Sequence, residues 1–212
     1  MKRAFLTSLL LVGLFAAASA QFLHIDTARL NSCYRALLKE PQSSSMQMEF
    51  FNAFPANWND FYCTYRFCEK DGFDLSMYDA AYEHIEALGG CTAINDTLFC
   101  KRLIALSVGA SLEVDAPNYL HWLVHRRMKQ KSDIFMYCLS QIERGHQMQF
   151  WQFYWSRIVD GATDKSEFKA LHAKYKKKYP DMMKRMAVAY ENFYNGVLFI
   201  SDFYRNMGNY NQ

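Results

Sequence analysis

The sequence predicts an all-α fold. Apolar residues recur at helical spacing along most of the chain, and signals for strands are weak throughout. Chain-breaking residues are scarce, with 9 glycines and 4 prolines in 212 residues, which favours helices joined by short loops. We therefore expect about nine helices, arranged as an irregular bundle or a short array of helical hairpins.

Polar capping residues mark the expected helix starts in the first half of the chain. Asp26 or Thr27 can cap a helix that runs to about residue 39, and Asn57 or Asn59 can cap a later one. The expected helices of this half lie at about residues 27 to 39, 46 to 54, from 57 or 59 to the turn at 71 and 72, at 76 to 88, and from 95 or 96 onward.

The second half continues in the same way. Asp115-Ala116-Pro117 opens a helix, because proline is well tolerated in the first helical turn. Ser132 or Asp133 caps the next helix, and Gly145 interrupts the chain before an aromatic segment at 148 to 159. A basic helix that starts at 163 to 166 ends at Pro180.

The last expected helix, at about residues 181 to 207, has the most regular apolar pattern. Its apolar residues alternate spacings of three and four, which predicts a continuous seam along one side. Such a seam packs along another helix, in the same chain as the ordinary case or in a second copy as the alternative. The seam consists of Met183, Met186, Tyr190, Phe193, Val197, Ile200, Tyr204 and Met207.

Residues 1 to 20 have the pattern of a secretory signal peptide. Met1-Lys2-Arg3 is basic, residues 4 to 18 are apolar, and Ala18-Ser19-Ala20 forms a small-residue cleavage site. We expect the mature chain to begin at Gln21, to form one domain over 21 to 212, and to be secreted or periplasmic. No later segment reaches the ~20 apolar residues that a transmembrane helix requires.

The 6 cysteines all follow the expected leader. Export to an oxidising compartment and the absence of a C-x-x-C pair favour structural disulfides or free buried thiols over a zinc site. The pairing remains open, with Cys91 and Cys100 as the favoured local bridge and with Cys63 and Cys68 able to pair only if a helix ends between them. The disulfide candidates are Cys33, Cys63, Cys68, Cys91, Cys100 and Cys138.

His121 and His125 are the candidate metal ligands. They lie four residues apart on an expected helix, a spacing that can bring two imidazoles to one metal ion. A zinc hydrolase needs a third ligand and a base, and Trp122 occupies the place of the glutamate in H-E-x-x-H. Both histidines border the apolar stripe centred on Val124, so we expect a structural role for them and no cofactor.

An aromatic and basic surface is the candidate site for a partner. Trp151 and Trp155 share a helical face with Gln152 alongside, and exposed indoles could stack on a sugar or anchor a protein. Burial between two helices is the alternative, because aromatic side chains usually end inside. Lys176 and Lys177 belong to a cluster that could contact an anionic lipid or glycan, or simply end a helix.

Four short segments stand out along the chain: Phe50-Phe51-Asn52-Ala53-Phe54-Pro55, Asn95-Asp96-Thr97-Leu98-Phe99, Val114-Asp115-Ala116-Pro117-Asn118-Tyr119 and Phe150-Trp151-Gln152-Phe153. Their order and spacing across about residues 46 to 160 resemble the landmarks of an uncharacterised family of secreted, all-helical proteins from Gram-negative gut bacteria. The resemblance implies an exported helical protein and no particular activity.

The leading hypothesis is an exported, non-catalytic helical protein that binds a protein or another envelope component. A net charge of only +3 and the expected export disfavour nucleic acid as a partner. The alternatives are a metal-dependent hydrolase that uses His121 and His125, and a structural accessory subunit that forms a homo-oligomer through the last helix.

Overall fold

The computed structural model describes residues 25 to 66, 75 to 112, 115 to 156 and 161 to 208, with the side chains at 75, 76, 161 to 164 and 196 to 208 excepted. These residues form helices and no strand, so the all-α prediction is confirmed. The expected leader and Cys68 lie outside the described residues. The helices are α1 (Thr27–Lys39), α2 (Ser44–Ala53), α3 (Trp58–Tyr65), α4 (Leu75–Asp79), α5 (Ala81–Gly90), α6 (Asp96–Ser107), α7 (Asp115–Ser140), α8 (Arg144–Trp155), α9 (Gly161–Tyr175) and α10 (Pro180–Gly208).

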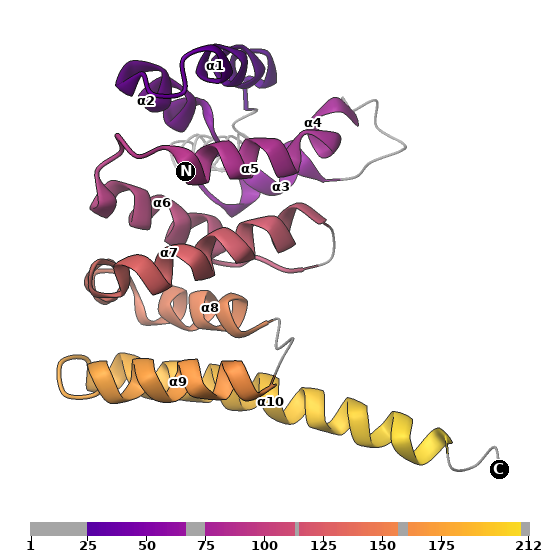
Figure 1. The fold of residues 1–212 in the computed structure, drawn as a ribbon. Coiled ribbons are helices and arrows are strands. Elements are labelled where there is room, and N and C mark those ends of the chain that lie inside the picture. Colours follow the sequence, from indigo (N-terminus) through magenta and orange to yellow (C-terminus); the bar gives the residue numbers. More distant parts are fainter. Residues whose placement is uncertain (1–24, 67–74, 113–114, 157–160, 209–212) are drawn as a thin grey trace, which may run out of the picture.

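The helices stack as an array of hairpins (Figure 1). Figure 1 shows α5, α7 and α9 one below another on one side of the stack, with α6, α8 and α10 behind them. Contacts give the directions: the ring of Tyr82 contacts that of Tyr119 and Glu86 pairs with Arg126, so α5 and α7 run parallel. The intervening α6 runs antiparallel to α7, because Asp96 at its start pairs with Lys131 late in α7. Of the two expected arrangements, the structure therefore adopts the array of helical hairpins and not the irregular bundle.

Local side-chain caps explain where several helices begin. The carboxylate of Asp26 accepts a hydrogen bond from the backbone N–H of Arg29 at 2.8 Å, and Asn57 accepts one from Asp60 at 3.0 Å. Asn95 accepts from Thr97 at 2.9 Å. Each cap satisfies a first-turn N–H that has no partner within its helix. The expected starts at these three positions are confirmed.

The structure confirms one expected boundary and corrects two. The helix start expected at Ser132 or Asp133 follows a kink in α7, where Lys131 has a non-helical φ of −133° and ψ of 37°. The segment expected as one helix at 76 to 88 is split into α4 and α5, because Ala80 adopts φ −84° and ψ −1°. Gly145 does not interrupt the chain, because α8 already begins at Arg144 and carries this glycine in its first turn.

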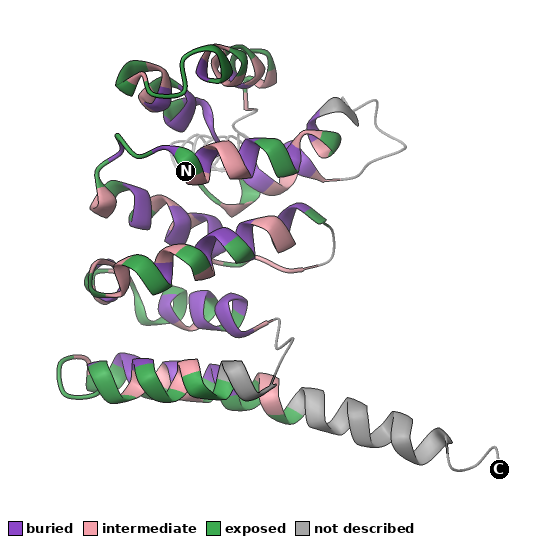
Figure 2. Cartoon of the chain, in the orientation of Figure 1, coloured by how far each residue is buried: buried purple, intermediate pink, exposed green. Residues whose placement is uncertain are grey.

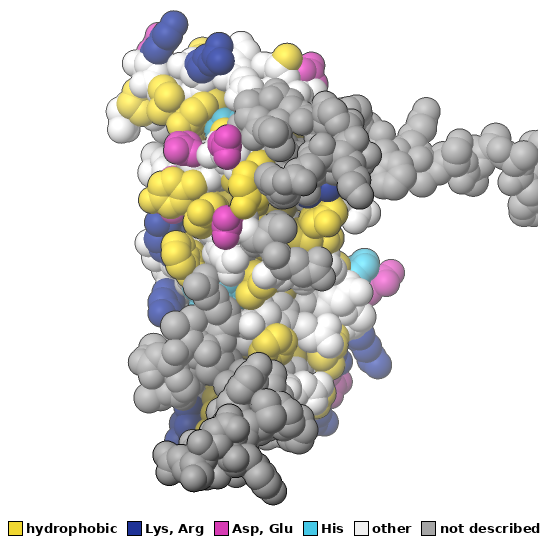
Figure 3. Space-filling model, turned by 90° about the vertical axis from the view of Figure 1, so that its right-hand side faces the viewer, with side chains coloured by type: hydrophobic (Ala, Val, Ile, Leu, Met, Phe, Trp, Pro, Cys, Tyr) yellow, Lys and Arg dark blue, Asp and Glu magenta, His cyan; other side chains and the backbone are white. Residues whose placement is uncertain are grey.

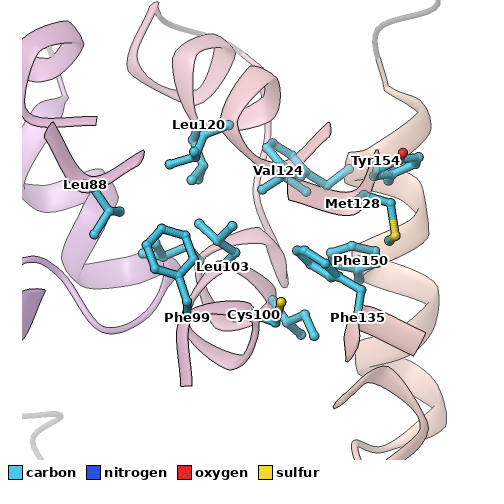
Figure 4. Close-up of a cluster of buried hydrophobic side chains, with 14 of the residues drawn as sticks. Leu88, Phe99, Cys100, Leu103, Leu120, Val124, Met128, Phe135, Phe150 and Tyr154 are labelled. Atoms are coloured by element: carbon cyan, nitrogen blue, oxygen red, sulfur yellow. The ribbon is translucent and has the colours of Figure 1, made fainter. Parts of the chain in front are cut away.

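The core lies between the layers of the stack. Figure 2 shows buried residues on the helix sides that face neighbouring helices and exposed residues on the outer sides. Figure 4 shows side chains of α5, α6, α7 and α8 pointing toward one another. This buried cluster includes Leu88, Phe99, Leu103, Leu120, Val124, Met128, Phe135 and Phe150, each exposed by 1% or less. One continuous core therefore holds the successive hairpins together.

The first half of the seam on α10 is packed within the chain. Met183 and Met186 are buried, and the ring of Tyr190 lies 5.2 Å from Trp155 of α8 in an edge-to-face contact. The seam residues from Val197 onward lie outside the described side chains. The intrachain alternative thus holds for the part of the seam that is described. Across all the described ranges, no helix combines the length and apolar character needed to span a bilayer.

The expected disulfides are not formed among the described cysteines. Cys33, Cys63, Cys91, Cys100 and Cys138 are all free thiols. The favoured Cys91–Cys100 bridge was wrong: both thiols are buried and free, and that of Cys91 donates to the carbonyl of Ala87 at 3.4 Å. Burial raises the pKa of Cys91 to about 11 and that of Cys100 to about 12. α3 does end between Cys63 and Cys68, as a bridge between them requires.

Candidate functional site

The two candidate metal ligands bind the end of α8. The Nε2 atoms of His121 and His125 lie 3.0 and 2.8 Å from one acceptor, the backbone carbonyl oxygen of Tyr154. Tyr154 is the second-to-last residue of α8, where carbonyl groups have no partner within the helix. To donate these bonds, each imidazole carries its proton on Nε2. The pair therefore caps α8 from the side of α7.

Burial favours the neutral form of His125. Its ring stacks on that of Tyr154 with a centroid distance of 3.8 Å, and the Tyr154 hydroxyl donates to Glu167 of α9. Glu167 also lies 3.7 Å from Nδ1 of His125 and 3.6 Å from the ammonium of Lys129. Burial lowers the pKa of His125 to about 4, and the cation of Lys129 acts in the same direction against the backbone bond to Tyr154. This cluster ties α7, α8 and α9 together.

The point on which the two imidazoles converge is occupied by a backbone oxygen. Both Nε2 atoms face the carbonyl oxygen of Tyr154, and the rings lie side by side with centroids 4.4 Å apart. Within the described part of the chain, no three His, Cys, Asp or Glu side chains gather closely enough to hold a metal ion. The geometry at His121 and His125 matches the structural role expected from the helical stripe.

The two tryptophans expected at a surface are buried. Trp151 and Trp155 are exposed by 0% and 1%. Their rings stack on one face of α8 with centroids 6.4 Å apart, and that face is covered because α10 packs along α8. The surface expectation for both residues was therefore wrong, and burial between helices was the correct alternative. Gln152, Lys176 and Lys177 are exposed, the first on α8 and the two lysines in the turn between α9 and α10.

Exposed aromatic side chains gather instead where α5 and α7 lie side by side. Tyr82 and Trp122 are 49% and 52% exposed, which is unusual for such large apolar side chains. Tyr119 lies between them, with ring centroids 5.2 Å from Tyr82 and 6.1 Å from Trp122. We call Tyr82, Tyr119 and Trp122 the aromatic surface. Figure 3, viewed from the side where α5 and α7 begin, shows hydrophobic side chains over the middle layers with acidic ones among them.

Polar contacts fix the two helices that carry the aromatic surface. The guanidinium of Arg126 on α7 approaches both carboxylate oxygens of Glu86 on α5, at 3.2 and 3.3 Å. On the other side of the aromatic surface, the hydroxyl of Tyr78 donates to Asp115 at 2.8 Å. A Cβ at Gly89 would lie 2.5 Å from a nitrogen of Arg126, so glycine leaves the space that this side chain occupies. The rings therefore sit on a braced pair of helices.

Sequence reasoning missed this surface although the signal was present. Trp122 is two residues from Val124, the centre of the buried stripe of α7, and so lies about 200° around the helix from it. Asp115, Tyr119, Trp122 and Arg126 recur at spacings of four, three and four, which marks an outward stripe. Which α5 residues would face that stripe depended on the packing of α5 against α7, and the sequence does not specify that packing.

The fold and this site define the chain as an all-helical hairpin array that presents three clustered aromatic rings. Comparison with models of known protein families gave no match, and neither the curated proteins nor the solved structures gave one. The resemblance to a secreted family of gut bacteria stays a prediction.

Proposed function

We propose that the mature chain is an exported, non-catalytic binding protein that recognises a protein of the cell envelope through the aromatic surface. The observation that carries this proposal is the half-exposed pair Tyr82 and Trp122, held on adjacent helices with Tyr119 between them. The pattern of residues 1 to 20 supports action outside the cytoplasm.

The chemistry of the aromatic surface suits a protein partner. Tyrosine, tryptophan and arginine contribute most of the binding energy at protein interfaces, and Arg126 lies beside the aromatic rings on α7. Tyrosine and tryptophan have few rotatable bonds, and both helices are braced by the pair Glu86 and Arg126. Binding would therefore order few side chains and would lose little entropy.

The alternative function is a metal-dependent hydrolase, and the two histidines that it would use already make a structural contact. His121 and His125 both bond to the carbonyl of Tyr154, and His125 is neutral above acidic pH. A hydrolase built on these residues would have to break that cap of α8 to bind a metal ion. This supports the binding proposal over the metal-dependent one.

The proposal is tested by comparing variants of the mature chain for capture of a protein from an envelope extract of the producing cells. Trp122→Ala is expected to weaken binding about 30-fold, in line with the ~2 kcal/mol typical of a central interface tryptophan. Tyr137→Ala is the matched control, because Tyr137 is also 52% exposed on α7 but lies outside the aromatic surface. Equal binding by the two variants would contradict the proposal, provided that both melt like the wild type.

The exported location has its own test. Expression of the full chain in a Gram-negative host, followed by fractionation and N-terminal sequencing, is expected to give a periplasmic or secreted product that begins at Gln21. A cytoplasmic product that retains residues 1 to 20 would contradict the expected compartment without bearing on the aromatic surface.

A further inference from the structure

A groove of about 510 Å³ lies between α6 and the junction of α7 with α8, away from the aromatic surface. Lys101 and Ile104 of α6, with Val108 directly after its end, recur at spacings of three and four and line one side of the groove. Cys138 and Ile142 line the other side together with His146 from the first turn of α8. The volume falls in the range of ~300 to 1,000 Å³ that is typical of small-molecule sites.

The floor of the groove is apolar. Ile104 and Cys138 are exposed by only 3% and 1%, while Val108 and Ile142 are partly buried against the core. Burial raises the pKa of the Cys138 thiol, so this residue contributes a neutral, apolar surface. An aliphatic chain bound along this floor would be removed from water and would contact side chains of α6 and of the α7–α8 junction.

Lys101 supplies the positive charge at the rim of the groove. Lys101 and His146 are both exposed, so His146 adds an imidazole that can hydrogen-bond, and no carboxylate is among the residues that line the groove. Within the described residues Lys101 makes no ion pair, whereas Lys131 on the adjacent helix is paired with Asp96 at 2.7 Å. α8 also starts beside this rim, and the exposed carboxylate of Glu143 at its N-cap position makes no hydrogen bond to the first-turn N–H groups. The ends of helices with free N–H groups favour negative charge.

We propose that this groove binds a free aliphatic carboxylate, with the acyl chain along Ile104, Val108 and Ile142 and the carboxylate between Lys101 and His146. The apolar floor calls for a chain of methylene groups, and the cationic rim without lining carboxylates calls for an anionic head. The small volume fits a single amphiphile. This site is independent of the aromatic surface, so the two proposals can fail separately.

The test is calorimetric titration of the mature chain with hexanoate, octanoate and decanoate below their aggregation concentrations. Affinity is expected to rise about fourfold for each added methylene group that reaches the floor. The uncharged alcohol of equal length is expected to bind more weakly, and Lys101→Gln should weaken decanoate binding about fivefold. Lys176→Gln is the matched control, because Lys176 is an exposed lysine in the turn between α9 and α10 and does not line the groove.

A second variant blocks the floor. Ala105→Phe places a large side chain in the groove from its half-buried position on α6 and should abolish binding while Lys101→Gln only weakens it. Trp122→Ala should bind decanoate as the wild type does. The proposal is overturned if decanoate shows no saturable binding, if Lys101→Gln and Lys176→Gln bind it equally, or if only anionic phospholipid vesicles bind and monomeric carboxylates do not.

Discussion

His121 and His125, one turn apart on α7, direct their Nε2 atoms at the same carbonyl oxygen of Tyr154. The contact joins α7 to the C-terminal end of α8, where backbone carbonyl groups have no hydrogen-bond donor within the helix. It gives a structural partner at the border of the core to two histidines that have the spacing of metal ligands.

Removal of these donors is expected to destabilise the fold. The double variant His121→Ala with His125→Ala leaves the Tyr154 carbonyl without the two donors, which should lower the free energy of unfolding by ~2 to 4 kcal/mol. Urea unfolding followed by circular dichroism measures this. His146→Ala is the control, because His146 is exposed and should change stability by less than ~0.5 kcal/mol. A chelator-sensitive stability of the wild type would instead support a bound metal ion.

Stability should fall in mildly acidic solution. Burial lowers the pKa of both His84 and His125 to about 4, below the ordinary value of 6.5. As the pH falls, these two histidines are protonated in the unfolded chain before they are protonated in the folded one. Their contribution to the free energy of unfolding is therefore fully present above pH 6.5 and is lost as the pH falls toward 4. The loss approaches ~1.4 kcal/mol per pH unit for each histidine.

Urea midpoints at pH 7.5, 6 and 5 measure this slope. The variant His125→Gln should show about half of the dependence that the wild type shows between pH 6 and pH 5, because of the two buried histidines only His84 then contributes. An unchanged slope in this variant would show that His125 is not neutral in the folded protein.

The buried thiols should resist modification. Cys91, Cys100 and Cys138 are buried with raised pKa values, so little reactive thiolate is available in the folded protein. Mass mapping after brief treatment with iodoacetamide should find the half-buried Cys33 and Cys63 modified and these three protected until urea is added. A peptide with a Cys91–Cys100 bridge in a non-reducing digest would contradict the free thiols.

Arg102 should be a strong determinant of stability. One of its guanidinium nitrogens lies 2.9, 3.0 and 3.2 Å from the carbonyl oxygens of Phe51, Phe54 and Pro55 at the end of α2. Arg102→Ala leaves these acceptors without their shared donor and should cost ~2 to 4 kcal/mol, measured by thermal unfolding. Arg35→Ala removes an exposed arginine and serves as the control. Equal effects of the two variants would show that the carbonyl contacts do not hold α2 to α6.

The sequence predicted the features that depend on neighbouring residues. Asp26, Asn57 and Asn95 cap helices through N–H groups two or three residues away, so their roles could be read locally. The break at Ala80 could not, because no glycine or proline marks it. The burial of Trp151 and Trp155 depends on α10, which packs onto α8 from about thirty residues further along the chain.

The aromatic surface was predictable only in part, because it depends on packing between helices as well as on neighbouring residues. The outward position of Trp122 follows from the helical wheel of α7, and its partner Tyr82 follows only from the packing of α5 on α7. The groove likewise combines one face of α6 with a helix junction that lies more than thirty residues away.

Hydroxyl-radical footprinting of the mature chain, read by mass spectrometry with and without the captured envelope protein, tests the central claim most directly. We predict rapid oxidation of Trp122 and Tyr82 in the free protein, slow oxidation of the buried Trp151 and Trp155, and protection of Trp122 and Tyr82 in the complex. Unchanged oxidation of Trp122 in the complex, with protection at Lys176 and Lys177 or elsewhere, would contradict the account.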